Sequence, residues 1–199
     1  ALIGISYYLI YIIGLLIMGM MASKGNQWYK LIYAALFVLA IAIALIKDKS
    51  PKNLGFSKGH LKADVIISTF LVLITFFLSV FFLSKKSFPE LLNLTLYFLF
   101  YIAFVEEMIF RSFIQSYLFG LRINEKIIFL LGGVFFSLMH LPFQMYINQD
   151  ISLSYVLSAA PQLIFCVLFH IFTCFIVYKR NNILIPIALH YVINFLQSI

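Results

Sequence analysis

Seven long apolar runs, separated by short polar segments, make up nearly the whole chain. A helix of about 20 residues crosses the hydrocarbon core of a bilayer, and each run approaches or exceeds that length. Lys, Arg, Asn, Gly, Ser or Pro clusters bound the runs, and Trp or Tyr lies at several edges, as at membrane interfaces. The pattern predicts an all-α polytopic transmembrane bundle of about seven spans. The predicted spans are Leu2–Ala22, Trp28–Ile46, Val65–Leu83, Leu91–Phe119, Ile127–Ile147, Tyr155–Tyr178 and Ile183–Ile199.

Composition excludes a soluble domain. Of the 199 residues, 64% are hydrophobic and 11% are charged, whereas soluble domains are nearer ~45–50% apolar and ~25% charged. A soluble protein of this size still leaves roughly 30% of its unfolded surface in water, which this sequence could not fill with polar groups. Seven spans leave no room for a second domain. We therefore expect one integral membrane domain over 1–199, with the motif-bearing core in 91–199.

The net charge of +7 is spread over the loops. Because no single basic patch forms, we expect contacts with anionic lipid head groups and no nucleic acid. Loops 47–64, 120–126 and 179–182, called here the basic face, carry nine Lys and Arg, and loops 23–30, 84–90 and 141–154, the opposite face, carry four. The positive-inside rule makes the basic face cytoplasmic. The abundance of Ile, Phe, Lys and Asn fits an AT-rich bacterial or archaeal genome. We therefore expect a protein of a prokaryotic cytoplasmic membrane.

Charged residues inside the fourth span are the most informative feature of the chain. Five of the seven acids are expected in loops: Asp48, Asp64, Glu90, Glu125 and Asp150. The other two, Glu106 and Glu107, stand with Arg111 among apolar neighbours. An ionised group at mid-membrane costs ~2.5–3.5 kcal/mol, so these must face protein or water. Glu107 and Arg111, at i and i+4, are expected to form an ion pair. Glu106, rotated by ~100°, has no local cation and suits a general base.

Two further spans carry polar residues at depth. His140 lies in the fifth span, and His190 and Asn194 lie in the seventh. Counted from the basic face at 1.5 Å per residue, Glu106 and His140 lie ~20 Å deep, His190 ~10 Å and Asn194 ~17 Å. A Glu, a His and a His/Asn pair on three helices at compatible depths predict a common site.

The ordered set Glu106-Glu107-x-x-x-Arg111, Phe136-x-x-x-His140 and His190-x-x-x-Asn194 resembles the CPBP family. That family comprises type II CAAX prenyl endopeptidases and bacteriocin-processing or immunity proteins, also called Abi proteins. The resemblance covers residues 106–194 and implies a glutamate-dependent intramembrane endopeptidase. Its substrate would be a membrane-associated or lipidated protein, or a peptide such as a bacteriocin precursor, and its site would open toward the cytoplasmic leaflet.

The resemblance also implies roles for single residues. Glu106 would activate water, His140 would help to hold or deprotonate that water, and His190 and Asn194 would stabilise the oxyanion. Such a set is chemically coherent, because amide hydrolysis without a Ser or Cys nucleophile needs an activated water, a proton donor and oxyanion donors. The residues expected to orient the site are Glu107, Arg111 and Phe136.

Three other interpretations stay open at this point. One is a non-catalytic bacteriocin-immunity or scaffold protein of the same fold, and another is a transporter whose ion pathway uses Glu106. The third is zinc catalysis with Glu106, His140 and His190 as ligands and one open position. Because the chain lacks HExxH and has no His pair at i and i+4, we expect no metal and no other cofactor. The sequence predicts nothing about oligomeric state.

The remaining polar and helix-breaking residues have structural explanations. His170 is expected to make a contact between helices. Cys166, His170 and Cys174 form a stripe ~12 Å long on one helix, too long for all three to bind one metal ion. Pro142 and Pro186 are expected to kink their helices near the site and open a cleft to water, and Pro161 to do likewise in the sixth span.

Overall fold

The computed structural model describes residues 1–48, 55–56 and 59–199. Lys49, Lys52 and Lys58 of the basic face lie outside the described residues. Helices and short connections make up the described chain, which confirms the predicted all-α class. The helical segments are α1 Leu2–Ser23, α2 Tyr29–Asp48, α3 Leu61–Leu78, η2 Ser79–Leu83, α4 Phe88–Leu96, η3 Tyr97–Ala103, α5 Phe104–Glu107, η4 Met108–Ile114, α6 Gln115–Leu118, η5 Phe119–Leu121, α7 Glu125–Leu138, α8 His140–Ile147, α9 Leu153–Ser158, α10 Ala160–Arg180 and α11 Leu184–Ser198.

Six helical stretches of the described chain are long and apolar enough to cross a membrane. They are Leu2–Ser23, Tyr29–Lys47, Leu61–Leu83, Phe88–Leu121, Glu125–Ile147 and Ala160–Arg180. The seventh predicted span corresponds to α11, which is apolar but shorter, at 15 residues. The sixth span begins at Ala160 rather than Tyr155, because the short helix α9 occupies the predicted start. The prediction of about seven spans is confirmed, with a short last helix.

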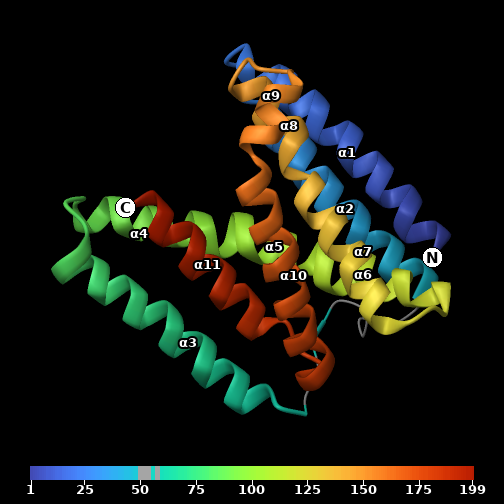
Figure 1. The fold of residues 1–199 in the computed structure, drawn as a ribbon. Helices are drawn as coiled ribbons and strands as arrows, with labels where there is room; N and C mark the ends of the chain where they lie inside the picture. Colours follow the sequence, from blue (N-terminus) through green and yellow to red (C-terminus); the bar gives the residue numbers. More distant parts are fainter. Residues whose placement is uncertain (49–54, 57–58) are drawn as a thin grey trace.

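The fourth span, α4 to η5, joins two groups of helices (Figure 1). On one side α1 packs against α2 and α8, and α7 packs against α10. On the other side α11 packs against α3 and against η3. Two buried apolar clusters follow this division, and the fourth span contributes to both, with Val105 and Ile109 in the first and Ala103 and Met108 in the second. Residues of α5 therefore lie where the two groups meet.

Two π-helical stretches, η3 and η4, flank the four residues of α5. Each π turn closes its hydrogen bonds over five residues instead of four, so the side chains beyond it face a different direction. Such turns are common at functional sites. Between them Glu106 is 8% exposed and Glu107 is fully buried. The irregular helix thus turns two consecutive carboxyl groups into the protein interior.

Pro142 and Pro186 have different effects on their helices. Pro142 has no N–H to donate to the carbonyl of Leu138, and the helix is interrupted at Met139, between α7 and α8, as expected. Pro161 is the second residue of α10, directly after the break at Ala159. The kink expected at Pro186 is wrong, because α11 begins at Leu184 and its first turn needs no N–H from Pro186.

Asp64 is a buried helical residue, and its expected position in a loop is wrong. Helix α3 begins at Leu61, so Asp64 stands in its first turn, fully buried. Its carboxylate pairs with the guanidinium of Arg180, the last residue of α10. This ion pair connects α3 to α10 on the basic face.

Candidate active site

The predicted ion pair between Glu107 and Arg111 is present at the centre of the fourth span. Arg111 Nε lies 3.1 Å from Glu107 Oε2, and both side chains are fully buried. The single Nε hydrogen is directed to Thr173 Oγ1 on α10, also at 3.1 Å, so the contact with Glu107 is a salt bridge without an aligned hydrogen bond. The guanidinium carbon lies 3.8 Å from the ring centroid of Phe136 on α7. Arg111 therefore connects the fourth span to two other helices.

His190 on α11 contacts both glutamates of α5. Its Nδ1 lies 2.7 Å from Glu107 Oε1, within hydrogen-bond distance. Its Nε2 lies 3.7 Å from Glu106 Oε2, close enough for electrostatic attraction but too long for a hydrogen bond. Glu107 thus serves Arg111 with one oxygen and His190 with the other. Within the described chain Glu106 Oε2 is buried and has no hydrogen-bond partner.

Glu106 and His140 line one cavity of about 200 Å³. His140 is the first residue of α8, directly after the interruption at Met139, and it is half-buried. Five tyrosines line the same space, and we call it the tyrosine-lined cavity: Tyr11, Tyr29, Tyr33, Tyr97 and Tyr101 with Leu15, Met18, Ile102, Glu106, Met139, His140, Phe143 and Gln144.

A smaller cavity of about 70 Å³ lies between α10 and α11. His190 and Asn194, one turn apart on α11, line it together with His140. His140 therefore borders both cavities, and His190 reaches from the smaller one to Glu106. Each of the four residues predicted to act in catalysis thus lines one of these two cavities, and His140 lines both.

Phe136 is the ring around which the histidines are arranged. It is 1% exposed, and its ring centroid lies 5.3 Å from that of His140, 5.7 Å from His170 and 5.9 Å from His190. Because Arg111 covers the same ring, a change at Phe136 would disturb the ion pair and the histidines together. Its position agrees with the expected orienting role, which stays a prediction.

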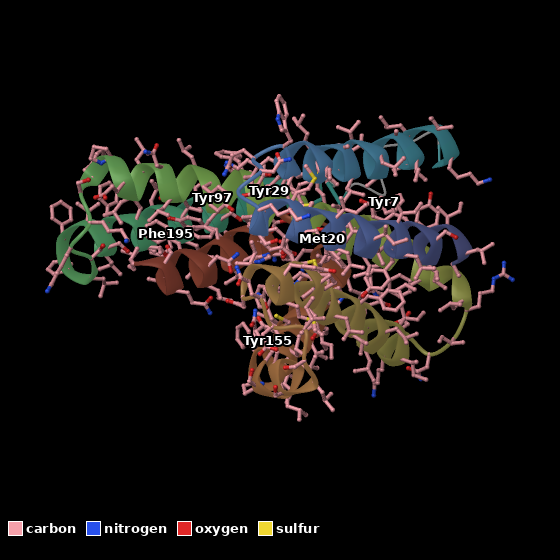
Figure 2. The ribbon with its side chains drawn as sticks, turned by 90° about the horizontal axis from the view of Figure 1, so that it is seen from above. Tyr7, Met20, Tyr29, Tyr97, Tyr155 and Phe195 are labelled. Carbon is pink, nitrogen blue, oxygen red and sulfur yellow. The ribbon has the colours of Figure 1, made fainter. Side chains whose placement is uncertain are left out.

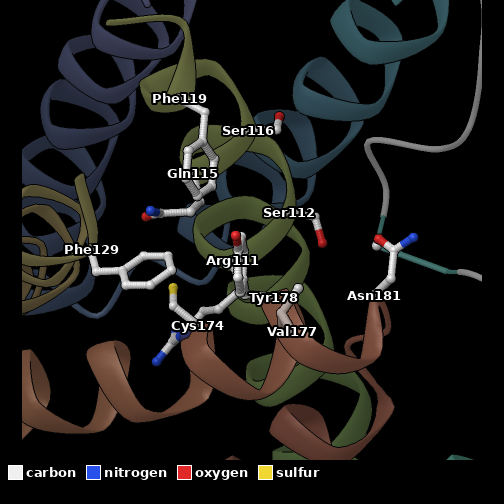
Figure 3. Close-up of a pocket in the computed structure, with 11 residues that line it drawn as sticks. Arg111, Ser112, Gln115, Ser116, Phe119, Phe129, Cys174, Val177, Tyr178 and Asn181 are labelled. Atoms are coloured by element: carbon white, nitrogen blue, oxygen red, sulfur yellow. The ribbon is translucent and has the colours of Figure 1, made fainter. Parts of the chain in front are cut away.

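His170 belongs to a second polar cluster, on the basic-face side of Arg111. Its Nε2 lies 3.2 Å from Gln115 Oε1 in the fourth span and 3.1 Å from Cys174 Sγ, which confirms the expected contact between helices. Figure 3 shows Gln115 and Arg111 on the fourth span opposite Cys174 on α10, around another cavity of about 200 Å³. Gly132 on α7 packs so closely here that a Cβ would collide with Gln115 and His170.

Within the described ranges, no three His, Cys, Asp or Glu side chains gather as they would around a metal ion. The expectation of a site without a cofactor stays a prediction.

Both cavities that His140 lines extend toward the opposite face. The tyrosine-lined cavity includes Tyr29, the first residue of α2, and Gln144, near the end of α8. The smaller cavity includes Gln162 at the start of α10 and Gln197 at the end of α11. Tyr29, Gln144 and Gln162 lie near helix ends that join loops of the opposite face, and Gln197 lies at the end of α11 remote from the basic face.

The tyrosines were missed in the sequence analysis, which found no motif in the first two spans. Their signal was present, since Tyr11 and Tyr33 stand inside apolar spans where a hydroxyl is costly without a polar neighbour.

Fold and site together define an integral membrane protein with a buried cluster of carboxyl, imidazole and amide groups. The sequence model of the type II CAAX prenyl endopeptidase Rce1-like family matches residues 87–196, more than half of the chain. The chain belongs to this family, and the resemblance inferred from the motifs is confirmed. Membership implies an intramembrane protease that acts in a bilayer on a membrane-associated peptide. No curated protein and no solved structure matched the chain significantly.

Proposed function

We propose that this protein is a glutamate-dependent endopeptidase that hydrolyses a peptide bond of a membrane-associated peptide or protein. One observation carries the proposal: Glu106 Oε2 is buried, has no hydrogen-bond partner among the described residues, and faces His190 at 3.7 Å. The cavity beside it also holds His140. A carboxylate left free next to a polar cavity is what activation of a water molecule requires.

In the proposed reaction Glu106 accepts a proton from a water held between it and His140. The hydroxide attacks the carbonyl carbon, the carbonyl electrons move to oxygen, and His190 and Asn194 donate hydrogen bonds to that oxyanion. When the C–N bond breaks, Glu106 returns the proton to the leaving amine. Atoms and charge balance without a covalent intermediate or a metal ion.

Glu107 defines how His190 can take part. Its Oε1 accepts the Nδ1 hydrogen at 2.7 Å, so His190 donates from Nε2 only if the ring carries both protons. The proposed oxyanion donor is therefore the doubly protonated ring.

Purified protein in nanodiscs, incubated with a set of hydrophobic peptides and followed by mass spectrometry, tests the proposal. We expect cleavage that Glu106→Gln abolishes and that Glu125→Gln, at the start of α7 on the basic face, leaves intact. Cleavage that persists in Glu106→Gln would contradict the mechanism. A phenotype in cells that survives Glu106→Gln, without any cleavage, would favour the non-catalytic immunity or scaffold function.

Access to the site is proposed from the opposite face, toward which both cavities extend. The positive-inside rule puts the basic face in the cytoplasm. An opening on the opposite face would then lie away from the cytoplasmic leaflet, where the site was expected to open. Single cysteines at the exposed Ile123 and Lys85, labelled in intact cells by a membrane-impermeant maleimide, decide which face is cytoplasmic. The native cysteines are both buried and give little background.

A further inference from the structure

The tyrosine-lined cavity leads from the protein surface to the proposed catalytic carboxylate. Tyr97 at its outer end is 45% exposed, whereas Tyr33 is 5% exposed and Tyr11 is fully buried. Tyr29 and Tyr97 both line the cavity and are seen close together in Figure 2. The cavity thus has a tyrosine at every depth.

Several of these rings form a continuous wall. The ring centroids of Tyr33 and Tyr101 are 5.1 Å apart, and those of Tyr101 and Tyr97 are 5.4 Å apart. The hydroxyl oxygens of Tyr11, Tyr33 and Tyr101 are buried, and that of Tyr101 has no hydrogen-bond partner among the described residues. A buried polar group without a partner is costly, so such a wall fits a polar guest.

The charge of the cavity lining determines which ligand groups it can bind. Among the described residues, Glu106 is the charged side chain on the wall, and no lysine or arginine lines it. A carboxylate and the electron-rich faces of phenol rings attract cations and repel anions.

The size of the cavity limits how much of a substrate it receives. A volume of about 200 Å³ is below the ~300–1,000 Å³ of a typical pocket for a drug-sized ligand and suits one long side chain.

We infer that the tyrosine-lined cavity is a specificity subsite for one lysine or arginine side chain of the peptide substrate, beside the bond that is cleaved. This inference rests on the proposed function. The cationic head lies along the row Tyr33–Tyr101–Tyr97, its N–H groups donate to the phenol oxygens, and Glu106 at the deep end supplies the attractive field. The activated water stays on the side of Glu106 that faces His140.

A matched peptide series tests the subsite in the purified protein. At each position around the cleaved bond, lysine is compared with norleucine, which has a similar shape without charge, and with glutamate. At one position we expect kcat/KM to be about 10-fold higher for lysine than for norleucine, and lowest for glutamate. Equal rates for lysine and norleucine at every position would overturn the inference.

Variants assign any such preference to the cavity. Tyr101→Leu removes a ring of the wall and should lower the kcat/KM of lysine peptides to that of norleucine peptides. Tyr101→Phe keeps the ring and should retain part of the preference. Phe100→Leu is the matched control. Phe100 is next to Tyr101 on the same helix, but its ring lines a different cavity, beside α3 and α11. A preference that is unchanged in Tyr101→Leu would contradict the subsite.

A binding measurement separates this inference from the proposed function. n-Butylammonium chloride should raise the melting temperature of the wild-type protein, whereas n-butanol and sodium chloride at equal concentration should not, and Tyr101→Leu should lose the effect. Stabilisation without any peptide cleavage would support the cation site and reject the endopeptidase. Cleavage without a lysine preference or an ammonium effect would reject the cation site alone.

Discussion

His190 holds one ring nitrogen 2.7 Å from Glu107 and turns the other toward Glu106, at 3.7 Å. The two glutamates are neighbours in sequence, yet Glu107 contacts Arg111 at 3.1 Å and His190 at 2.7 Å, whereas Glu106 contacts His190 at the longer distance of 3.7 Å. This difference is the physical basis for giving Glu107 an orienting role and Glu106 a reactive one.

Loss of the Glu107 carboxylate should destabilise the protein strongly. Glu107→Ala leaves the fully buried Arg111 without its counter-charge and the Nδ1 of His190 without its acceptor, and breaking one side of a buried ion pair typically costs about 3–5 kcal/mol. Unfolding by SDS in mixed micelles measures the change. Glu90→Ala, which removes an exposed carboxylate that caps the start of α4, is the control and should destabilise the protein much less.

Arg111→Lys should be harmful although it keeps the charge. A lysine cannot lie flat over the Phe136 ring while its amine also serves Glu107 and Thr173, as the guanidinium does. We expect a loss of roughly 1–3 kcal/mol in the free energy of unfolding, about that of a hydrogen bond to a charged group. Arg122→Lys, in the exposed loop after η5, should stay within about 0.5 kcal/mol of the wild type. Equal stability of the two variants would contradict the stacked arrangement.

Asn194→Ala should lower the rate of hydrolysis with little effect on folding. Its half-buried amide lines the small cavity one turn beyond His190, and removal of one oxyanion donor typically costs ~10²–10³ in kcat. Initial rates at saturating peptide give the effect on kcat, and the thermal melt should shift by no more than a few degrees. Gln197→Ala, one turn further along α11, should retain most of the rate. A rise in KM with unchanged kcat would instead make Asn194 a binding residue.

Gly132→Ala should loosen the contact between α7 and α10. The added Cβ would lie 2.6 Å from His170 Nε2 and would also collide with Gln115 Oε1. Overpacking in a tight core costs typically 1–3 kcal/mol. Gly14→Ala is a demanding control, because its Cβ meets only the flexible end of Leu36, at 2.7 Å. We expect the first variant to be clearly less stable than the second, and the opposite order would be inconsistent with the packing.

The parts of the fold that depend on local pattern were predictable. Apolar runs gave the spans, and the i, i+4 spacing gave the Glu107–Arg111 pair, because both arise within one helix. The interruption after Leu138 followed from the missing N–H of Pro142. The kink predicted at Pro186 was wrong, because a proline in an apolar run does not show whether the helix has already begun before it. Here α11 begins only two residues earlier, at Leu184.

Contacts between helices could not be predicted from the sequence. Depth counted from the basic face put His190 about 10 Å nearer to that face than Glu106. In the structure the two side chains lie 3.7 Å apart. That count assumed parallel helices with common ends, whereas α11 is short and crosses the fourth span at η3 and α5. The π turns around α5 are equally invisible, because a change from i+4 to i+5 hydrogen bonds needs no special residue.

The shortness of α11 has a consequence for the surrounding lipid. Its 15 residues span about 22 Å, less than the ~30 Å hydrocarbon core of a typical bilayer. Such hydrophobic mismatch thins the bilayer locally or draws the ends of the helix to the interface. The head-group level beside α11 would thereby come nearer to Asn194 and His190, and we expect the acyl-chain length of the membrane to affect how easily water reaches them.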